Sequence, residues 1–223
     1  LLDISKNTKD KGMVLFLIMG DKLSFFLPNY HTDPVFSKAL IEIKNNVRIE
    51  AVQLQWKKDF SSIQHIKKVH IPWNILENEN KDSGCYCVVL ELKKSMVIKT
   101  GNLGSVSYRK GFYIYAGSAM RAMNARVNRH LRKRKSFHWH IDYLRNECNV
   151  IKAYQIRAVD RLECQLASML QSICGKEIEK FGSTDCKCSS HLFWFNDNPV
   201  KLQSFQKLIE YFRINRLCEK YGL

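Results

Sequence analysis

The sequence contains no apolar stretch long enough to cross a membrane, no internal repeat and no low-complexity tract. Its longest apolar run is Met13–Met19, whereas a membrane-spanning helix needs about 20 such residues. No segment resembles a signal peptide, although the chain opens on Leu1 rather than Met, so that further residues can precede it. These absences argue against a membrane partner, and we expect a cytoplasmic protein.

Acidic side chains are few relative to basic ones. The 223 residues include 21 Asp and Glu against 36 Lys and Arg, which gives a net charge of +15 and a pI of about 9.5. This excess favours a polyanionic partner, with nucleic acid first and an anionic membrane surface second. The alternative is a soluble protein that is merely basic.

A secretion signal is missing, and this absence decides how the cysteines are interpreted. Eight cysteines in a chain of this length and without such a signal predict reduced cytosolic thiols rather than a disulfide framework. They are Cys85, Cys87, Cys148, Cys164, Cys174, Cys186, Cys188 and Cys218.

Residues 1–78 predict a small α/β module. Val14–Met19 is continuously apolar, as expected of a central strand covered on both faces. Asp33 and Pro34 suit the cap and first turn of a helix. Strands are expected near 14–19, 47–56 and 66–71, so that the module contains one βαβ-like unit.

The polar stretch 77–83 separates this module from a second one at residues 84–223. Apolar residues at spacings of three and four predict the helix that carries Met123 and Val127. The expected strands are 84–92, 96–99, 106–109, 112–115, 150–159 and 191–195, and the expected helices are 120–134, 138–146, 161–174 and one from Asn198 toward Lys220.

The segment "YIYAGSA" at 113–119 directly precedes a stretch whose charged residues are all basic until Asp142. Gly84-Cys85-Tyr86 and Tyr115-Ala116-Gly117 resemble the two halves of the GIY-YIG nuclease motif. Arg126 and His130 share a helical face four residues apart, and Glu163 lies near the start of a later helix. These residues follow one another in the order found in that superfamily.

Longer segments strengthen the resemblance: "GFYIYAGSA", "ARVNRHLR", "HWHIDYL", "LECQLA" and "FGSTDCKCSSHLF". Over residues 84–195 they resemble a small GIY-YIG-like family sometimes fused to DNA-repair proteins such as endonuclease III. Residues 11–73 resemble the C-terminal part of the sugar fermentation stimulation protein A family, which has a PD-(D/E)XK nuclease-like fold and whose acidic metal motif lies upstream of the matched part. The resemblances imply an α/β protein in which a partial PD-(D/E)XK-like unit precedes a small antiparallel sheet flanked by helices.

The GIY-YIG resemblance implies how phosphodiester hydrolysis would be divided among residues. Tyr86 would act as general base or orient the water, with its pKa of about 10 lowered by nearby cations. Arg126 would hold the phosphate oxygens, and Glu163 would bind Mg²⁺ or Mn²⁺. Tyr115 would orient the water or support Tyr86, and His130 would contact phosphate or relay a proton. Alternatively, the tyrosines pack as ordinary strand residues and Arg126 is solvated.

Two departures from the GIY-YIG pattern leave catalysis open. A hairpin at 94–110 separates the half-motifs, and Ala125 stands where some relatives have a lysine. The remaining basic residues would contact the nucleic-acid backbone, although the run 132–135 is equally typical of a solvated helix end stabilised by the helix dipole. The expected contact residues are Arg121, Arg129, Arg132, Lys133, Arg134, Lys135 and His140.

A second polar cluster allows two interpretations. Cys186, Cys188 and His191, with either His138 or His140, would supply enough ligands for zinc. However, the Cys-x-Cys spacing is not the common one, and a second cysteine pair is missing. The sequence therefore favours a role in shaping the active-site rim over a zinc site.

The function we expect is metal-dependent cleavage of duplex or branched DNA, in a repair context that includes fusion or association with repair enzymes. The main alternative is a DNA-binding protein that retains the nuclease fold without catalysis. A third hypothesis is a scaffold with negligible affinity for DNA at physiological salt.

Overall fold

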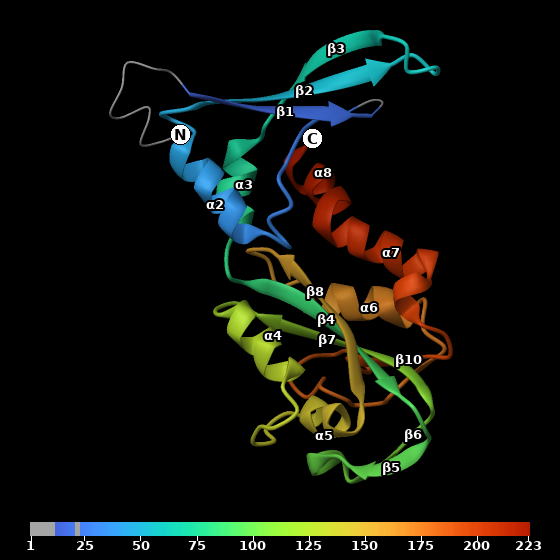
Figure 1. Cartoon of the computed structure of the whole chain (residues 1–223). Helices are drawn as coiled ribbons and strands as arrows, with labels where there is room; N and C mark the ends of the chain where they lie inside the picture. Colours follow the sequence, from blue (N-terminus) through green and yellow to red (C-terminus); the bar gives the residue numbers. More distant parts are fainter. Residues whose placement is uncertain (1–11, 21–22) are drawn as a thin grey trace. The chain divides into compact units, whose positions relative to one another are not determined.

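The computed structural model describes residues 12–20 and 23–223. The chain divides into two compact units (Figure 1). One unit comprises the residues up to Asn80 together with Cys218–Leu223, and the other comprises Lys81–Leu217. In the part of the chain that the structure describes, no helix has both the length and the apolar character needed to span a bilayer.

A three-stranded sheet and two helices form the first unit. The sheet order is β1 (Met13–Met19), β2 (Arg48–Trp56) and β3 (Ile63–Val69), and the helices are α2 (Pro34–Ile43) and α3 (Trp73–Glu79). β1 runs parallel to β2, whereas β3 is antiparallel to it. The Asp33 carboxylate accepts a 2.9 Å hydrogen bond from the amide of Phe36, and Pro34 begins α2. The βαβ-like unit and its helix start are therefore confirmed.

The expectation that β1 is a central strand covered on both faces is wrong. Among the described residues, β1 lies at the edge of its sheet, and its side chains alternate between exposed and half-buried positions. Leu17 and Met19 are 60% and 74% exposed. An apolar run does not reveal this alternation, because both the exposed and the half-buried residues of β1 are apolar.

The second unit is built on a five-stranded sheet. Its order is β8 (Asn149–Arg157), β4 (Gly84–Leu92), β7 (Gly111–Ala119), β10 (Leu192–Phe195) and β9 (Lys176–Glu177), and all neighbouring pairs are antiparallel. A hairpin of β5 (Met96–Lys99) and β6 (Ser105–Tyr108) lies between β4 and β7 in sequence. The predicted α/β fold with an antiparallel sheet is thus confirmed.

Helices cover both faces of this sheet (Figure 1). α4 (Met123–Leu131) and α5 (His140–Glu147) pack on the face that carries Tyr86 and Tyr115. α6 (Glu163–Gln171) and α7 (Gln203–Glu210) pack on the opposite face, against Cys85 and Cys87. Because β4 is buried on both sides, its sequence is continuously apolar from Cys85 to Leu90.

Two predicted helices are shorter or more broken than expected. The helix expected at 120–134 is α4, which stops at Leu131 because Arg132 adopts an extended conformation with ψ of 140°. The helix expected from Asn198 toward Lys220 consists of a 3₁₀ turn at Pro199–Lys201, α7, a π-helical turn at Tyr211–Asn215 and α8 (Arg216–Tyr221).

Candidate active site

A cleft of about 590 Å³ in the second unit brings together residues that are far apart in the sequence. Ser118, Trp139, Gly182 and Asp185 contribute to its wall. Six residues expected from the sequence also line it: Tyr86, Tyr115, Arg126, His130, His140 and Glu163.

Strand register places the two tyrosines on one face of the sheet. Tyr86 on β4 lies opposite Gly117 on β7, and Tyr115 lies opposite Val88. Because side chains two apart on a strand share a face, both phenols point toward α4. Gly117 is required by this arrangement, since a Cβ there would lie 2.6 Å from atoms of the Tyr86 ring.

The start of α4 is anchored to the sheet, and this fixes Arg126 and His130. Asp82 accepts hydrogen bonds from the Met123 amide at 3.1 Å and, through its side chain, from the Asn124 amide at 3.0 Å. The buried Arg157 on β8 donates to the side chain of Asn124 at 2.9 Å. Since these contacts hold the first turn of α4, Arg126 and His130 face the cleft from fixed positions.

Glu163 reaches the cleft from the other face of the sheet. It is the first residue of α6, and β10 pairs only with residues 112–115 of β7. Beyond that point, the described residues include no strand next to the outer edge of β7. The Glu163 side chain therefore lies beside Ser118, whose Oγ donates a hydrogen bond to Glu163 Oε2.

The Tyr86 phenol is paired with His130. Its oxygen lies 2.9 Å from His130 Nε2, and the side chain is 1% exposed. Burial raises the pKa of Tyr86 far above its ordinary value, with the neighbouring Tyr115 acting in the same direction. The expected lowering of this pKa by nearby cations is therefore wrong, because burial outweighs the opposing effect of Arg126.

His130 is neutral at physiological pH. Burial lowers its pKa to about 4, and Lys135 and Arg129 add to the effect. A neutral ring accepts a hydrogen bond at one nitrogen and donates from the other. The tautomer that carries its proton on Nδ1, which is 3.9 Å from Asp142 Oδ1, leaves Nε2 able to accept a hydrogen bond from the Tyr86 phenol.

Asp142 is the centre of a buried charge network. Arg129 binds its two carboxylate oxygens at 3.1 and 3.0 Å, and Lys135 Nζ lies 2.8 Å from Oδ1. The amides of His138 and Trp139 donate to Oδ2 at 2.9 and 3.0 Å. Burial alone would raise the pKa of Asp142, but these donors bring it well below its ordinary value. Asp142 is therefore a permanent anion that favours positive charge on the neighbouring imidazole.

We expect His130 to make the stability of the protein pH-dependent. Its folded pKa of about 4 is below the unfolded value of 6.5, so the unfolded chain takes up the proton first and stability falls as pH drops from 6.5 toward 4. Between pH 7 and 5, wild type should lose roughly 2 kcal/mol more than His130→Gln. Urea denaturation at both pH values measures the difference. His138→Gln is the control, because His138 is exposed, and parallel losses in wild type and His130→Gln would contradict the assignment.

Arg126 and Glu163 are two of the charged residues on the cleft surface, which also carries Lys180 and Asp185. Arg126 is exposed, donates to the Ser118 carbonyl at 2.9 Å, and its guanidinium carbon lies 5.4 Å from the centre of the Trp139 ring. Burial alone would raise the pKa of Glu163, but contacts with His191 and Ser118 lower it. With Ser118 occupying one lone-pair position, the ionised carboxylate can still bind a divalent cation that keeps most of its water ligands.

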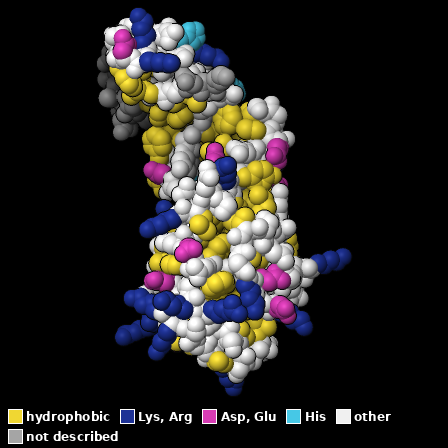
Figure 2. All heavy atoms as spheres, turned by 90° about the vertical axis from the view of Figure 1, so that its right-hand side faces the viewer, with side chains coloured by type: hydrophobic (Ala, Val, Ile, Leu, Met, Phe, Trp, Pro, Cys, Tyr) yellow, Lys and Arg dark blue, Asp and Glu magenta, His cyan; other side chains and the backbone are white. Residues whose placement is uncertain are grey.

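The residues expected to contact nucleic acid differ in their surroundings. Arg121, Arg132, Lys133 and Arg134 are exposed and form no ion pair within residues 12–20 and 23–223. Arg129 and Lys135 instead bind the buried Asp142, which indicates a structural role for both. In Figure 2, Lys and Arg side chains project from the lower part of the face shown, with acidic side chains between them.

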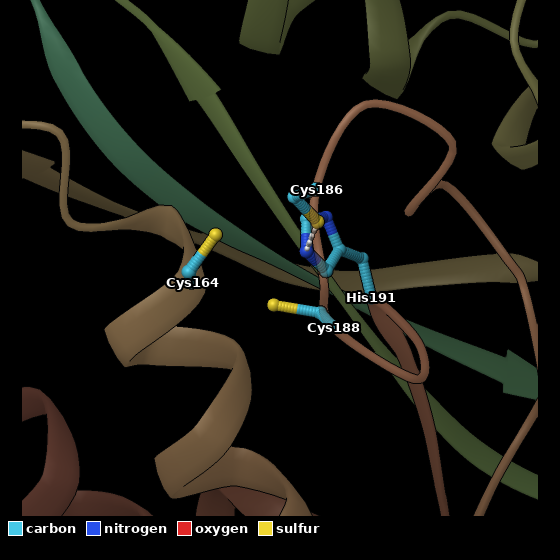
Figure 3. Close-up of side chains that lie close together, drawn as sticks. All are labelled: Cys164, Cys186, Cys188 and His191. Atoms are coloured by element: carbon cyan, nitrogen blue, oxygen red, sulfur yellow. Dashed lines mark hydrogen bonds between the residues drawn. The ribbon is translucent and has the colours of Figure 1, made fainter.

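The cysteine and histidine cluster has a different membership from the one expected. Cys186, Cys188 and His191 lie close together, but the fourth member is Cys164 at the start of α6 (Figure 3). His138 and His140 line the cleft instead. Neither histidine therefore belongs to the cluster, as the zinc alternative would have required, whereas the favoured role at the rim of the cleft fits both.

Three contributors were missed by sequence reasoning. Asp142 was visible in the sequence only as the first acidic residue after a long basic stretch, which did not reveal that it binds Arg129 and Lys135. Ser118 and Trp139 carry no comparable signal, since their roles arise from contacts with Glu163 and Arg126.

The helix-covered antiparallel sheet and its cleft of phenol, guanidinium and carboxylate define a GIY-YIG-like α/β domain. A family model described as "Domain of unknown function DUF123" matches residues 85–214, which is more than half of the chain. The protein belongs to this GIY-YIG-like family.

A second model, described as "Sugar fermentation stimulation protein RE domain", matches residues 1–60. Both resemblances are confirmed, with the first extending beyond residue 195 and the second ending before residue 73. Together they indicate a nuclease-like or DNA-binding family. No curated protein and no solved structure matches the chain.

Proposed function

We propose that the protein is a metal-dependent endonuclease that hydrolyses phosphodiester bonds of DNA. The observation that supports this most is the convergence of Tyr86, Arg126 and Glu163 on one cleft, in a domain of a GIY-YIG-like family. These groups supply a proton acceptor, a phosphate-binding cation and a metal ligand, which phosphodiester hydrolysis requires.

The contacts of Tyr86 suggest how the attacking water loses its proton. The water would give a proton to the Tyr86 oxygen while the phenol proton passes to His130 Nε2, which is 2.9 Å away. The resulting imidazolium would be stabilised by Asp142. Since a bound phosphate brings further negative charge, it would raise the pKa of His130 and favour the transfer. The hydroxide bonds to phosphorus, and the bond from phosphorus to the 3′-oxygen breaks.

Arg126 and Glu163 would act on the phosphate itself. The exposed guanidinium of Arg126 can donate two parallel hydrogen bonds to non-bridging oxygens as their charge increases. Glu163 would hold one Mg²⁺ or Mn²⁺, which supplies Lewis-acid stabilisation of the departing oxygen. Tyr115 would limit the movement of the Tyr86 and His130 rings, whose centres lie 6.5 and 5.7 Å from its own.

The exposed basic side chains after α4 are proposed to bind the DNA backbone. Arg132→Gln combined with Lys133→Gln should weaken duplex binding and reduce the log–log salt slope by about 0.9 for each lost phosphate contact. Fluorescence anisotropy across a salt series measures both quantities. Lys201→Gln with Lys207→Gln is the matched control, because these exposed lysines lie just before and within α7, on the opposite face of the sheet. Equal slopes in the two double variants would contradict the assignment.

A non-catalytic DNA-binding protein is the second candidate. The observation that favours it is the burial of Tyr86, whose phenol is 1% exposed and strongly disfavoured as an anion. This candidate predicts salt-sensitive binding without strand cleavage under any divalent metal.

The test is incubation of the protein with end-labelled nicked, flapped and branched DNA in Mn²⁺. The endonuclease proposal predicts cut strands that disappear in excess chelator. Salt-sensitive binding of all three substrates without any cut strand would overturn it in favour of the second candidate. A preference for nicked or branched forms would support the proposed place in DNA repair, including association with repair enzymes.

A further inference from the structure

Cys164, Cys186, Cys188 and His191 form a cluster (Figure 3). It adjoins the candidate active site, because His191 Nδ1 lies 3.4 Å from Oε1 of the cleft residue Glu163. One ligand atom from each residue lies within 4.8 Å of all the others. Cys186 Sγ and His191 Nε2 are 3.4 Å apart. The side chains point toward a common centre, with Cys164 coming from α6 and the others from the segment that leads into β10.

We infer that these four residues form a structural zinc site with three thiolate ligands and one imidazole ligand. In tetrahedral zinc with metal–sulfur bonds of about 2.3 Å, neighbouring ligand atoms are about 3.8 Å apart. Since the ligand atoms of the cluster lie within 4.8 Å of one another, changes of about 1 Å or less in these distances would reach this spacing. Thiolate and imidazole ligands favour zinc over Mg²⁺ or Mn²⁺, so this metal differs from the one proposed at Glu163.

The surrounding backbone explains what zinc would contribute. Residues 180–191 contain no helix or strand. Two backbone hydrogen bonds join the ends of this segment: the Lys180 amide donates to the Ser189 carbonyl at 2.7 Å, and the His191 amide donates to the Phe181 carbonyl at 2.8 Å. A metal bound by three residues of this segment and by Cys164 would fix it to the start of α6. Such a link substitutes for the missing secondary structure.

The zinc site would also position the active-site carboxylate. His191 Nε2 faces Cys186, while Nδ1 lies 3.4 Å from Glu163 Oε1. A carboxylate beside the second nitrogen of a metal-bound histidine is the usual outer-sphere arrangement in zinc proteins. The same segment supplies Gly182 and Asp185 to the cleft wall. Zinc would therefore hold both Glu163 and the rim of the cleft in place.

The test measures metal rather than DNA cleavage, so it does not depend on the proposed nuclease activity. Full-length protein produced with added zinc should contain about one zinc per chain by plasma mass spectrometry, as four protein ligands bind one ion. Co²⁺ substitution should give the ligand-field bands of tetrahedral cobalt together with a thiolate charge-transfer band. Absence of zinc from wild type, or absence of the charge-transfer band, would overturn the inference.

Variants identify the ligands. Cys186→Ser and Cys164→Ser should each weaken zinc binding by at least about tenfold, since even outer-sphere partners contribute that much. Cys174→Ser is the matched control, because this half-buried thiol bonds to the Gln171 carbonyl and lies outside the cluster. Equal zinc affinity in all three variants would overturn the ligand assignment. The Co²⁺ spectrum of wild type keeps the inference testable if a ligand variant fails to fold.

Discussion

Tyr86→Phe is expected to lower the cleavage rate by about 10²- to 10⁴-fold, the usual contribution of a group that accepts a proton in the transition state. The substitution keeps the ring that packs against Gly117 and removes only the oxygen bonded to His130 Nε2. DNA affinity should change little, because the 1% exposed phenol offers almost no surface to a ligand. Single-turnover cleavage in Mn²⁺, with binding measured on the same samples, separates the two effects.

Tyr113→Phe is the matched control for this variant. Tyr113 is also a buried tyrosine, and its hydroxyl donates to the Arg109 carbonyl at 2.8 Å away from the cleft. Each variant removes one hydrogen bond, that of Tyr86 with the buried His130 or that of Tyr113 with the exposed Arg109, which costs about 0.5–1.5 kcal/mol of stability. Only Tyr86→Phe should lose cleavage. Equal rates for the two variants would contradict a chemical role for Tyr86.

Asp142→Asn is expected to lower the free energy of unfolding by about 3–5 kcal/mol, as found when one partner of a buried ion pair is removed. The carboxylate is fully buried and binds Arg129, Lys135 and two backbone amides. An asparagine side chain accepts at only one atom and places N–H donors against a lysine with only 6% exposure. Urea denaturation measures the loss.

Glu147→Gln is the control for Asp142→Asn, because it removes an exposed carboxylate from the same helix. Its effect should stay within about 0.5 kcal/mol. The Asp142 contribution is present above the unfolded pKa of about 3.9 and is lost as pH falls through the lower folded value. A loss below 1 kcal/mol in Asp142→Asn, roughly the value of an exposed pair, would contradict the buried network.

Strand positions in the second unit followed closely from the sequence. β4 and β5 have the predicted bounds of 84–92 and 96–99, because a polar turn at 93–95 separates their apolar residues. α3 and β9 were not predicted. α3 lacks a side-chain cap bond, and the two-residue β9 exists through its pairing with β10. Neither has a local pattern strong enough to identify it.

The part of the cleft formed by motif residues could be predicted from the sequence, because strand pairing brings those residues together. Tyr86, Tyr115, Arg126 and Glu163 line one cleft as expected, because β4 and β7 pair along their length. The sequence did not predict which basic side chains pair with a buried carboxylate and which stay exposed. Arg129 and Lys135 resemble Arg132 in the sequence, and only the turn that brings Asp142 beneath α4 distinguishes them.

We propose that Glu163 completes one catalytic cleft with Tyr86 and Arg126. Mn²⁺-dependent cleavage of end-labelled flapped DNA by wild type and by Glu163→Gln, which preserves side-chain size, tests this role. We predict cut strands from wild type, at least about 10²-fold slower cleavage by the variant, and the same salt-dependent DNA affinity for both. Equal cleavage by the two proteins, or none by wild type, would contradict the claim.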